Sequence, residues 1–400
     1  MKKILVVKGQ SAYNVLRLAA DKICRGFENC GYQVDVIDIL AEQGPEKWMA
    51  VGEKIEEYEF YFSIQALFWN LEQQELPWLQ DMRRVGWIVD DPVYHAARLL
   101  LSTGKKANIL ISRDSHAEQV RREYSKFDRV ATLYNGGFVG EQKIDYRSKD
   151  INVFFPGTYM SIRKAEEEIQ NMDNGFREIA NQVKNRIVGR NLASAWQTEL
   201  GRYLAEINFA ISDTEFETLE RVMGPLDNYQ RACMRVSIIE ALLQSGIRVT
   251  VVGEGWDGYE GKGRENLTVL SDKGMDITEV IALMGRSKIV LNNTNILDGM
   301  HERIITAMLA NAVSVTNEYE IMNNFFESGK ELVTFPLNQI EKLPQIVADL
   351  LANPDKAERI AQAGYEAALR AHTWEHRGEQ IVKWMQDGKP FSYGAEEESA

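Results

Sequence analysis

The segment Leu291–Arg303 carries the group of side chains with the clearest chemical signature. A strand is predicted to run into a polar loop there, and the helix that follows has apolar residues at helical spacing. His301, Glu302 and Arg303 crowd its first turn, where the helix dipole favours anions and disfavours an arginine. An arginine in that turn is better explained by a bound diphosphate, which it can contact through two hydrogen bonds. The segment therefore predicts an anion site; the alternative is that Asp298 only caps the helix.

A second polar group follows the strand predicted at Val85–Val89. Asp90 and Asp91 stand at the end of this strand, and His95 comes shortly after. Two adjacent carboxylates repel each other and lose hydration when buried, so stability does not explain them. Asp91 or His95 could contact an acceptor or act as a general base. His116, which follows the next strand, would lie on the same side of the binding site. The alternative is that Asp91 caps a helix that begins at the next residue, Pro92.

Glycine-containing turns follow other predicted strands. Gly157 and Thr158 stand at a strand-to-helix turn, where a backbone can approach a phosphate. Trp256 follows Gly253 and Gly255, and its ring could stack on a base or sugar or simply anchor the loop. The loop after the first strand is either a tight turn or a polar rim of a cleft, and its polar residues are Gln10 and Ser11.

Strands and helices alternate along the first third of the chain, which is typical of a parallel sheet covered on both faces. Strands are expected at Ile4–Lys8, Tyr32–Leu40, Glu59–Ser63, Val85–Val89, Ala107–Ser112 and Arg129–Leu133. The glycine-rich segment Tyr134–Asp150 breaks the alternation and is interpreted as a linker. Ligands of such sheets bind beyond the carboxyl ends of the strands, which is where the polar groups above are placed.

A second α/β set is expected after the linker, with a long helical insert at about residues 161–246. Its strands are expected at Ile151–Phe155, Arg248–Val252, Leu267–Leu270, Lys288–Asn292, Val313–Thr316 and Leu332–Phe335. We therefore predict an N-terminal Rossmann-like domain over residues 1–145 and a C-terminal one over residues 150–373. A last helix, in residues 374–400, is expected to pack back on the first domain.

Composition excludes several classes of protein. The chain has 400 residues, and 46 Lys+Arg against 59 Asp+Glu give a net charge of −13, which disfavours a nucleic-acid partner. No stretch approaches the ~18 apolar residues of a transmembrane segment, and the first residues read as a strand rather than a signal peptide. The three cysteines have no metal-binding or disulfide spacing, which favours a cytoplasmic location.

Taken together, these motifs resemble the GT-B glycosyltransferases, and most of all the spore-maturation CgeB-like group. The resemblance covers nearly the whole chain and is carried by segments 87–92, 155–159, 253–256, 298–303, 307–308, 313–317 and 373–377. It implies two Rossmann-like domains that face a central cleft. It also implies a nucleoside-diphosphate sugar as donor substrate, held by the C-terminal domain, with the acceptor entering against the N-terminal one. No cofactor or metal is expected, because basic side chains and a helix N-terminus neutralise the diphosphate.

The resemblance assigns residues to each side of the cleft. The donor residues are Gly157, Thr158, Tyr159, Gly253, Glu254, Gly255, Trp256, Asn293, Asp298, Gly299, Met300, His301, Glu302 and Thr306. Arg303 would stabilise the leaving diphosphate, and Asp91 and His95 are the other catalytic candidates. The acceptor-side residues are Gln10, Ser11, Asp90 and His116.

One departure from the family pattern concerns stereochemistry. Many retaining members carry two glutamates eight residues apart, and the matching positions here are Asp298 and Thr306. The first acid is shorter and the second is lost, so ribose recognition and the choice between retention and inversion stay open; Glu302 is an alternative ribose contact.

The sequence is compatible with three functions. The first is a metal-independent glycosyltransferase of the hexosyltransferase type, which transfers a sugar to a hydroxyl of a protein or surface glycan. The second is a nucleotide-sugar epimerase of the same fold, which needs no acceptor. The third is a non-catalytic protein that binds nucleotides or carbohydrates.

Overall fold

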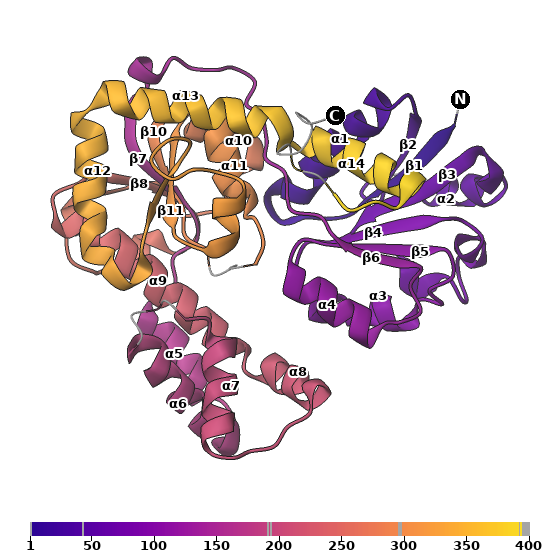
Figure 1. Ribbon diagram of the computed structural model, residues 1–400, viewed down its shortest axis with the longest axis horizontal. Helices are drawn as coiled ribbons and strands as arrows, with labels where there is room; N and C mark the ends of the chain where they lie inside the picture. Colours follow the sequence, from indigo (N-terminus) through magenta and orange to yellow (C-terminus); the bar gives the residue numbers. More distant parts are fainter. Residues whose placement is uncertain are drawn as a thin grey trace.

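Two parallel six-stranded sheets, each flanked by helices, lie side by side in this computed structural model (Figure 1). The structure describes residues 2–41, 44–189, 192, 194–294, 298–391 and 393. Residues 295–297 of the polar loop, and residues 392 and 394–400 of the predicted terminal segment, lie outside the described residues. Within the described part of the chain, no helix is both long and apolar enough to cross a membrane.

The N-terminal domain is built on the sheet β2-β1-β3-β4-β5-β6. Val6 stands opposite Val36 on one side and Phe62 on the other, so the centre of the sheet is apolar, as expected when helices cover both faces. Its strands are β1 (Lys3–Lys8), β2 (Gln33–Asp38), β3 (Tyr58–Ile64), β4 (Arg84–Ile88), β5 (Ala107–Ile111) and β6 (Arg129–Thr132). Its helices are α1 (Val15–Asn29), α2 (Gly44–Gly52), α3 (Ala96–Leu101) and α4 (Asp114–Glu123).

The C-terminal domain repeats this plan with the order β12-β11-β10-β7-β8-β9. Its strands are β7 (Ile151–Pro156), β8 (Val249–Val252), β9 (Leu267–Ser271), β10 (Ser287–Leu291), β11 (Val313–Asn317) and β12 (Val333–Phe335). Helices α9 (Gly224–Gln244), α10 (Ile277–Gly285), α11 (Glu302–Leu309), α12 (Leu343–Ala352) and α13 (Pro354–Ala371) pack around them. The predicted strands therefore correspond to observed ones in both sheets.

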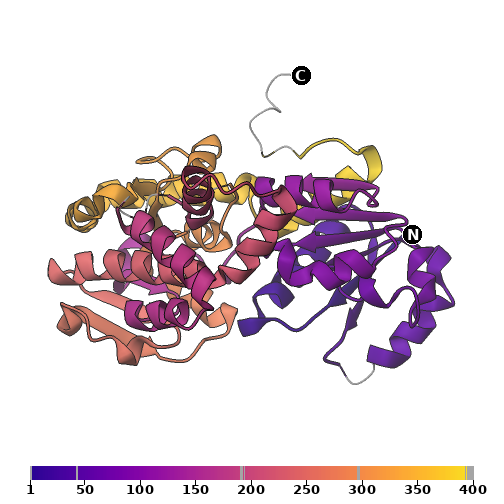
Figure 2. The same cartoon turned by 90° about the horizontal axis from the view of Figure 1, so that it is seen from below.

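The predicted helical insert forms an arm that projects from the C-terminal domain (Figure 1). It consists of α5 (Ile162–Gln170), α6 (Asn174–Gly189), α7 (Trp196–Glu206), α8 (Asp213–Val222) and the first part of α9. Buried side chains including Leu200, Leu204 and Leu226 hold these helices together. Helix α8 extends back towards α4 of the N-terminal domain, where Glu217 forms an ion pair with Arg122 (Figures 1 and 2).

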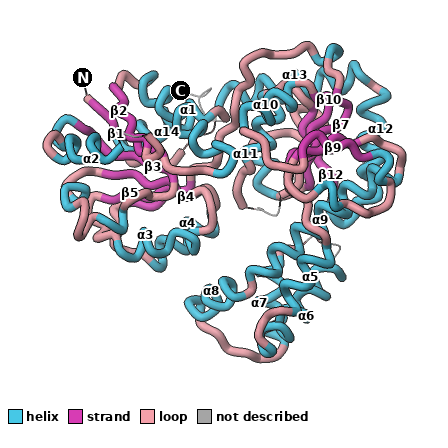
Figure 3. Tube along the Cα trace, turned by 180° about the vertical axis from the view of Figure 1, so that it is seen from behind, coloured by secondary structure: helices cyan, strands magenta, loops and turns pink. Residues whose placement is uncertain are grey.

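The last helix, α14 (Trp374–Asp387), crosses back and packs along α1, as predicted (Figure 3). The two helices meet through glycines, because a Cβ on Gly26 would lie 2.1 Å from the Glu375 carbonyl oxygen. A Cβ on Gly378 would lie 2.4 Å from the carbonyl oxygen of Ile23. Only residues without side chains allow this approach.

Gly378→Ala is expected to destabilise the protein, because the added methyl group meets backbone atoms that cannot move aside. Overpacking of this kind costs about 1–3 kcal/mol, which should appear as a lower midpoint in urea unfolding. Gly175→Ala in α6 is the matched control, since nothing lies within 4 Å of its Cβ position and alanine favours a helix. Equal midpoints for the two variants would contradict this packing.

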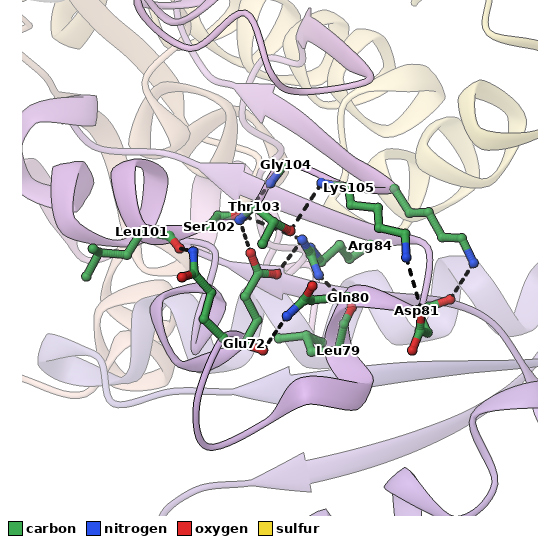
Figure 4. A network of polar contacts seen from close by, with 12 residues as sticks. Glu72, Leu79, Gln80, Asp81, Arg84, Leu101, Ser102, Thr103, Gly104 and Lys105 are labelled. Atoms are coloured by element: carbon green, nitrogen blue, oxygen red, sulfur yellow. Dashed lines mark hydrogen bonds and ion pairs between the residues drawn. The ribbon is translucent and has the colours of Figure 1, made fainter.

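A buried polar network holds the long β3–β4 connection against the N-terminal sheet (Figure 4). Glu72 and Arg84 form an ion pair with both side chains 0% exposed. Arg84 Nη1 also donates to the Leu79 carbonyl at 2.5 Å, and Glu72 accepts from the backbone N–H of Thr103. The network lies at the start of β4, at the opposite end of the strand from the polar residues that follow it.

Candidate functional site

The carboxyl ends of both sheets face a cleft of about 870 Å³. Its walls come from the loop after β4 and the start of α4, from α7, α8 and the start of α9 in the arm, and from the residues that lead into α11. In the C-terminal sheet the winding direction changes between β7 and β10. Ligands bind outside such a switch point, so the turn after β7 and the loop after β10 are expected to contribute to a site.

Helix α11 begins at the cleft with His301 as its N-cap residue. His301 Nδ1 accepts from the backbone N–H of Arg303 at 3.2 Å. The alternative that Asp298 caps this helix is therefore wrong, because Asp298 lies three residues earlier and bonds elsewhere. His301 and Glu302 both line the cleft, as the anion-site interpretation requires.

Three arginines gather beside this helix start, and we call Arg231, Arg235 and Arg303 the arginine cluster. Arg303 donates to the carbonyl oxygen at the end of β7, and its Nη2 lies 3.2 Å from His301 Nε2. Arg235 donates to the backbone and side-chain oxygens of Thr158 at 2.7 and 2.8 Å. Arg231 lines the cleft itself. The cluster thus joins the turn after β7, helix α9 and the start of α11.

The charges of the arginine cluster shift the pKa values of the groups around it. Burial lowers the pKa of Arg235 to about 9, and the charges of Arg303 and Arg231 act in the same direction. Burial, followed by Arg303, Arg231 and Arg235, lowers the pKa of His301 well below its ordinary value, so the ring is neutral at pH 7. Cations that repel each other in this way are stabilised by a bound anion. The arginine cluster therefore favours a bound anion such as a diphosphate.

Arg303 was predicted from the sequence, whereas Arg231 and Arg235 were missed. They lie about seventy residues before Arg303, in a helix interpreted only as part of the insert. Their spacing of four residues places them on one face of α9. Two arginines on one helix face were the feature of the sequence that could have indicated an anion site there.

Asp298 links the two domains across the cleft. Its Oδ1 accepts from Arg113 Nε at 2.8 Å, and its Oδ2 accepts from the backbone N–H of Ser115 at 2.8 Å. Gly299 forms an antiparallel bridge with Arg113 next to this contact. Burial would raise the pKa of Asp298, but the Arg113 charge and the Ser115 hydrogen bond outweigh it, and the pKa lies below its ordinary value. The link is therefore complete at neutral pH and is lost as acid protonates Asp298.

Asp298→Asn is expected to loosen the contact between the domains, because the amide cannot neutralise Arg113. Small-angle X-ray scattering should show a larger radius of gyration, and wild type should show the same change only as pH falls below the usual carboxyl range of about 4. Asp150→Asn is the matched control, since Asp150 pairs with Arg286 inside one domain. An unchanged radius for Asp298→Asn would contradict the role of this link.

The N-terminal wall contains the predicted acceptor-side carboxylates. Asp91 Oδ1 accepts from the Val93 N–H at 3.0 Å, so Asp91 caps the 3-10 turn that follows, while its Oδ2 lies 3.8 Å from His116 Nε2. Asp90, Asp91 and His116 all line the cleft. His95 is turned away: its Nδ1 lies 3.1 Å from Arg98 Nη1 and its Nε2 lies 3.9 Å from Asp90 Oδ2. Asp91 is therefore better placed than His95 to meet an acceptor.

The glycine turns of the C-terminal domain lie against each other. A Cβ on Gly253, whose φ is 141°, would lie 2.4 Å from the Gly157 carbonyl oxygen. Trp256 is fully buried and its indole N–H donates to the same oxygen at 2.6 Å. Trp256 therefore anchors the loop, which corrects the prediction that it stacks on a base or sugar. The Trp256 ring packs on Tyr159. Gly255, directly before Trp256, has a φ of 91°, a backbone conformation that favours glycine.

The loop after β1 reaches the other domain through neighbours of the predicted residues. Tyr13 donates to Glu254, and Asn14 Nδ2 donates to Asp276 Oδ2 at 2.6 Å. Ser11 Oγ accepts from the Leu16 N–H, and Gln10 is exposed. The loop therefore contributes to the contact between the two domains. Glu254, a predicted donor residue, takes part in this contact through Tyr13.

Three other predicted donor residues are buried. Met300 packs in the apolar cluster around α11. The hydroxyl of Thr306 accepts from the Phe138 N–H at 3.1 Å and donates to the Glu302 carbonyl at 2.9 Å, so it holds the interdomain connection. Asn293, directly after β10 at the switch point, is 7% exposed, and its Oδ1 has no hydrogen-bond partner among the described residues.

The carboxylates and histidines that the structure describes around the cleft do not form a typical metal site. Across the described ranges, no group of three or more His, Cys, Asp or Glu side chains is placed to hold a metal ion.

Comparison with known proteins agrees with this architecture. A family model described as glycosyl transferase-like matches residues 234–383, which include α11 and the arginine cluster except Arg231. Among curated proteins, no sequence matches significantly.

Several solved structures share the fold over nearly the whole chain. Anabaena HepE, in complex with UDP and glucose, is 12% identical with a TM-score of 0.53, covering 97% of this chain and 100% of its own. Sucrose-phosphate synthase from Thermosynechococcus elongatus is 10% identical with a TM-score of 0.51, covering 96% and 98%. A mutant of T4 phage BGT, in complex with UDP-glucose, is 9% identical with a TM-score of 0.53, covering 97% and 100%. The chain therefore has the GT-B fold predicted from its sequence, and its C-terminal part matches the glycosyl transferase-like family.

Proposed function

We propose that the protein is a glycosyltransferase that transfers a sugar, of hexosyl type, from a nucleoside-diphosphate sugar to a hydroxyl of a protein or glycan acceptor. The observation that carries this proposal is the arginine cluster beside the start of α11, at the switch point of the C-terminal sheet. HepE was solved with UDP and glucose and the BGT mutant with UDP-glucose, and these ligands support a nucleotide-sugar donor. The motif resemblance to the CgeB-like group supports a surface glycan or protein as acceptor.

The donor would lie with its diphosphate at the arginine cluster. Negative charge grows on the diphosphate as the bond to the sugar breaks, so groups that stabilise this charge act mainly in the transition state. Arg303 is held in place by its hydrogen bond to the carbonyl oxygen at the end of β7, and its Nη2 lies 3.2 Å from the Nε2 atom of His301, whose ring is neutral at pH 7. Its charge is thus available to the leaving group without a metal ion, and Asn293 offers an amide at the same switch point.

The acceptor would enter against the N-terminal wall. Asp91 presents one carboxylate oxygen beside His116, while its other oxygen is used in capping the turn. A carboxylate in this position accepts a hydrogen bond from the acceptor hydroxyl and orients it towards the donor sugar. Asp298 keeps the two walls together through Arg113.

The proposal is tested by incubating the protein with UDP-glucose, UDP-N-acetylglucosamine, GDP-mannose and dTDP-glucose in the presence of EDTA. We expect release of the nucleoside diphosphate from one of them, slowly with water and faster with an acceptor glycan. Conversion of the sugar without nucleotide release would instead show an epimerase. Binding without any conversion would show a non-catalytic protein, and a strict requirement for Mg²⁺ would contradict the proposed role of the arginines.

A further inference from the structure

The helical arm carries an acidic side chain into the cleft that the sequence alone did not single out. Glu220 of α8 lines the cleft, as does Asp91 on the opposite, N-terminal wall. The ion pair between Glu217, on the same helix, and Arg122 of α4 holds this part of the arm against the N-terminal domain. Glu220 itself is half-buried and has no hydrogen bond or ion pair among the described residues.

We propose that Glu220 is the general base of the transfer reaction and that Asp91 positions the acceptor beside it. This inference rests on the proposed function, because it needs a sugar donor at the arginine cluster. The acceptor oxygen attacks the anomeric carbon, the bond from that carbon to the phosphate oxygen breaks, and the nucleoside diphosphate leaves with the electron pair. The acceptor proton passes to the Glu220 carboxylate and then to solvent. Attack from the face opposite the leaving group inverts the anomeric configuration.

The surroundings of Glu220 suit a proton acceptor. Burial, followed by the negative charges of Asp91 and Glu217, raises the pKa of Glu220 to about 7, although Arg113 and Arg122 oppose the shift. A base is most effective when its pKa lies near the working pH. Asp91 takes the positioning role instead, because one of its oxygens is already bonded to the Val93 N–H.

Glu220→Gln tests the proposal through hydrolysis of whichever nucleotide sugar the wild type consumes, with water as acceptor. We expect kcat to fall by about 10²-fold or more, as removal of a general base does, while the wild-type rise of kcat with pH near 7 disappears. Sodium formate should restore activity to Glu220→Ala, because a free carboxylate can replace the missing one. Glu178→Gln, on an exposed position of α6, is the matched control and should retain wild-type activity.

Asp91→Asn gives a second, directional readout. Removing the Asp91 charge should lower the pKa of Glu220, so the remaining activity should rise at a lower pH than in wild type.

Activity of Glu220→Gln within threefold of wild type, or absence of formate rescue in a folded Glu220→Ala, would overturn the proposal. Calorimetric titration with UDP distinguishes failure of the role assigned to Glu220 from failure of the proposed glycosyltransferase function. Wild type that binds UDP and turns over the donor while Glu220→Gln does so equally well refutes only the role of Glu220. Wild type that neither binds nor turns over any nucleotide sugar refutes the proposed function and this inference with it.

Discussion

Replacing Arg303 with alanine is expected to lower kcat by about 10²–10³-fold, the usual effect of losing one group that stabilises transition-state charge. Arg303 occupies the first turn of α11 and reaches both the end of β7 and the ring of His301. These contacts are few, and they run to one backbone carbonyl and to one neighbouring ring, so the thermal unfolding midpoint should change little. The loss should fall mainly on kcat, because the charge on the leaving diphosphate develops in the transition state.

Two variants sharpen this experiment. Arg303→Lys should recover part of the activity, since lysine supplies a charge but not the planar pair of donors. Arg163→Ala is the matched control, because Arg163 is an exposed arginine whose ion-pair partner among the described residues is Glu167 of the same helix, α5. Near-normal turnover in a folded Arg303→Ala protein would contradict the assignment of the diphosphate site.

Replacing Glu72 with glutamine is expected to cost about 3–5 kcal/mol of unfolding free energy, as is typical when one partner of a buried ion pair is removed. Both side chains are fully buried, so the variant would leave the Arg84 guanidinium without a counter-charge in the protein interior (Figure 4). The measurement is equilibrium unfolding in urea at constant pH. Lys105→Ala is the matched control, because its ion pair with Asp81 is exposed and such pairs contribute about 0–1 kcal/mol.

A double replacement separates the charge effect from packing. Glu72→Leu combined with Arg84→Met removes both charges and keeps most of the volume, so it should recover much of the stability that Glu72→Gln loses. Glu72→Gln as stable as wild type would show that the buried pair contributes nothing to the fold.

The sequence predicted the two sheets because strands buried on both faces are continuous apolar runs, and their spacing reveals the helices between them. It also predicted that His301 and Glu302 reach the cleft, because an arginine in a first helical turn is electrostatically unusual. The loop after β4 was predicted for a similar reason, since adjacent carboxylates at a strand end do not stabilise a fold. These predictions depend only on local sequence.

Features that depend on tertiary contacts could not be predicted in the same way. Asp298 was predicted as a donor residue, with helix capping as the alternative, but it bonds Arg113, which lies 185 positions away. Trp256 has the same local sequence whether it stacks on a ligand or anchors a loop, and only its burial decides. Arg231, Arg235 and Glu220 lie on helices whose polar faces looked solvent-exposed. Nothing local shows that Arg231 and Glu220 line the cleft or that Arg235 bonds Thr158.

Binding of a nucleoside diphosphate by the arginine cluster is tested most directly by calorimetric titration with UDP, GDP, dTDP and CDP. In EDTA, we expect wild type to bind one of them with 1:1 stoichiometry, Arg303→Ala to bind it at least tenfold more weakly, and Arg163→Ala to bind it like wild type. Added Mg²⁺ should change the affinity little. Failure of wild type to bind any of the four, or equal binding by wild type and Arg303→Ala, would contradict a diphosphate site at these arginines.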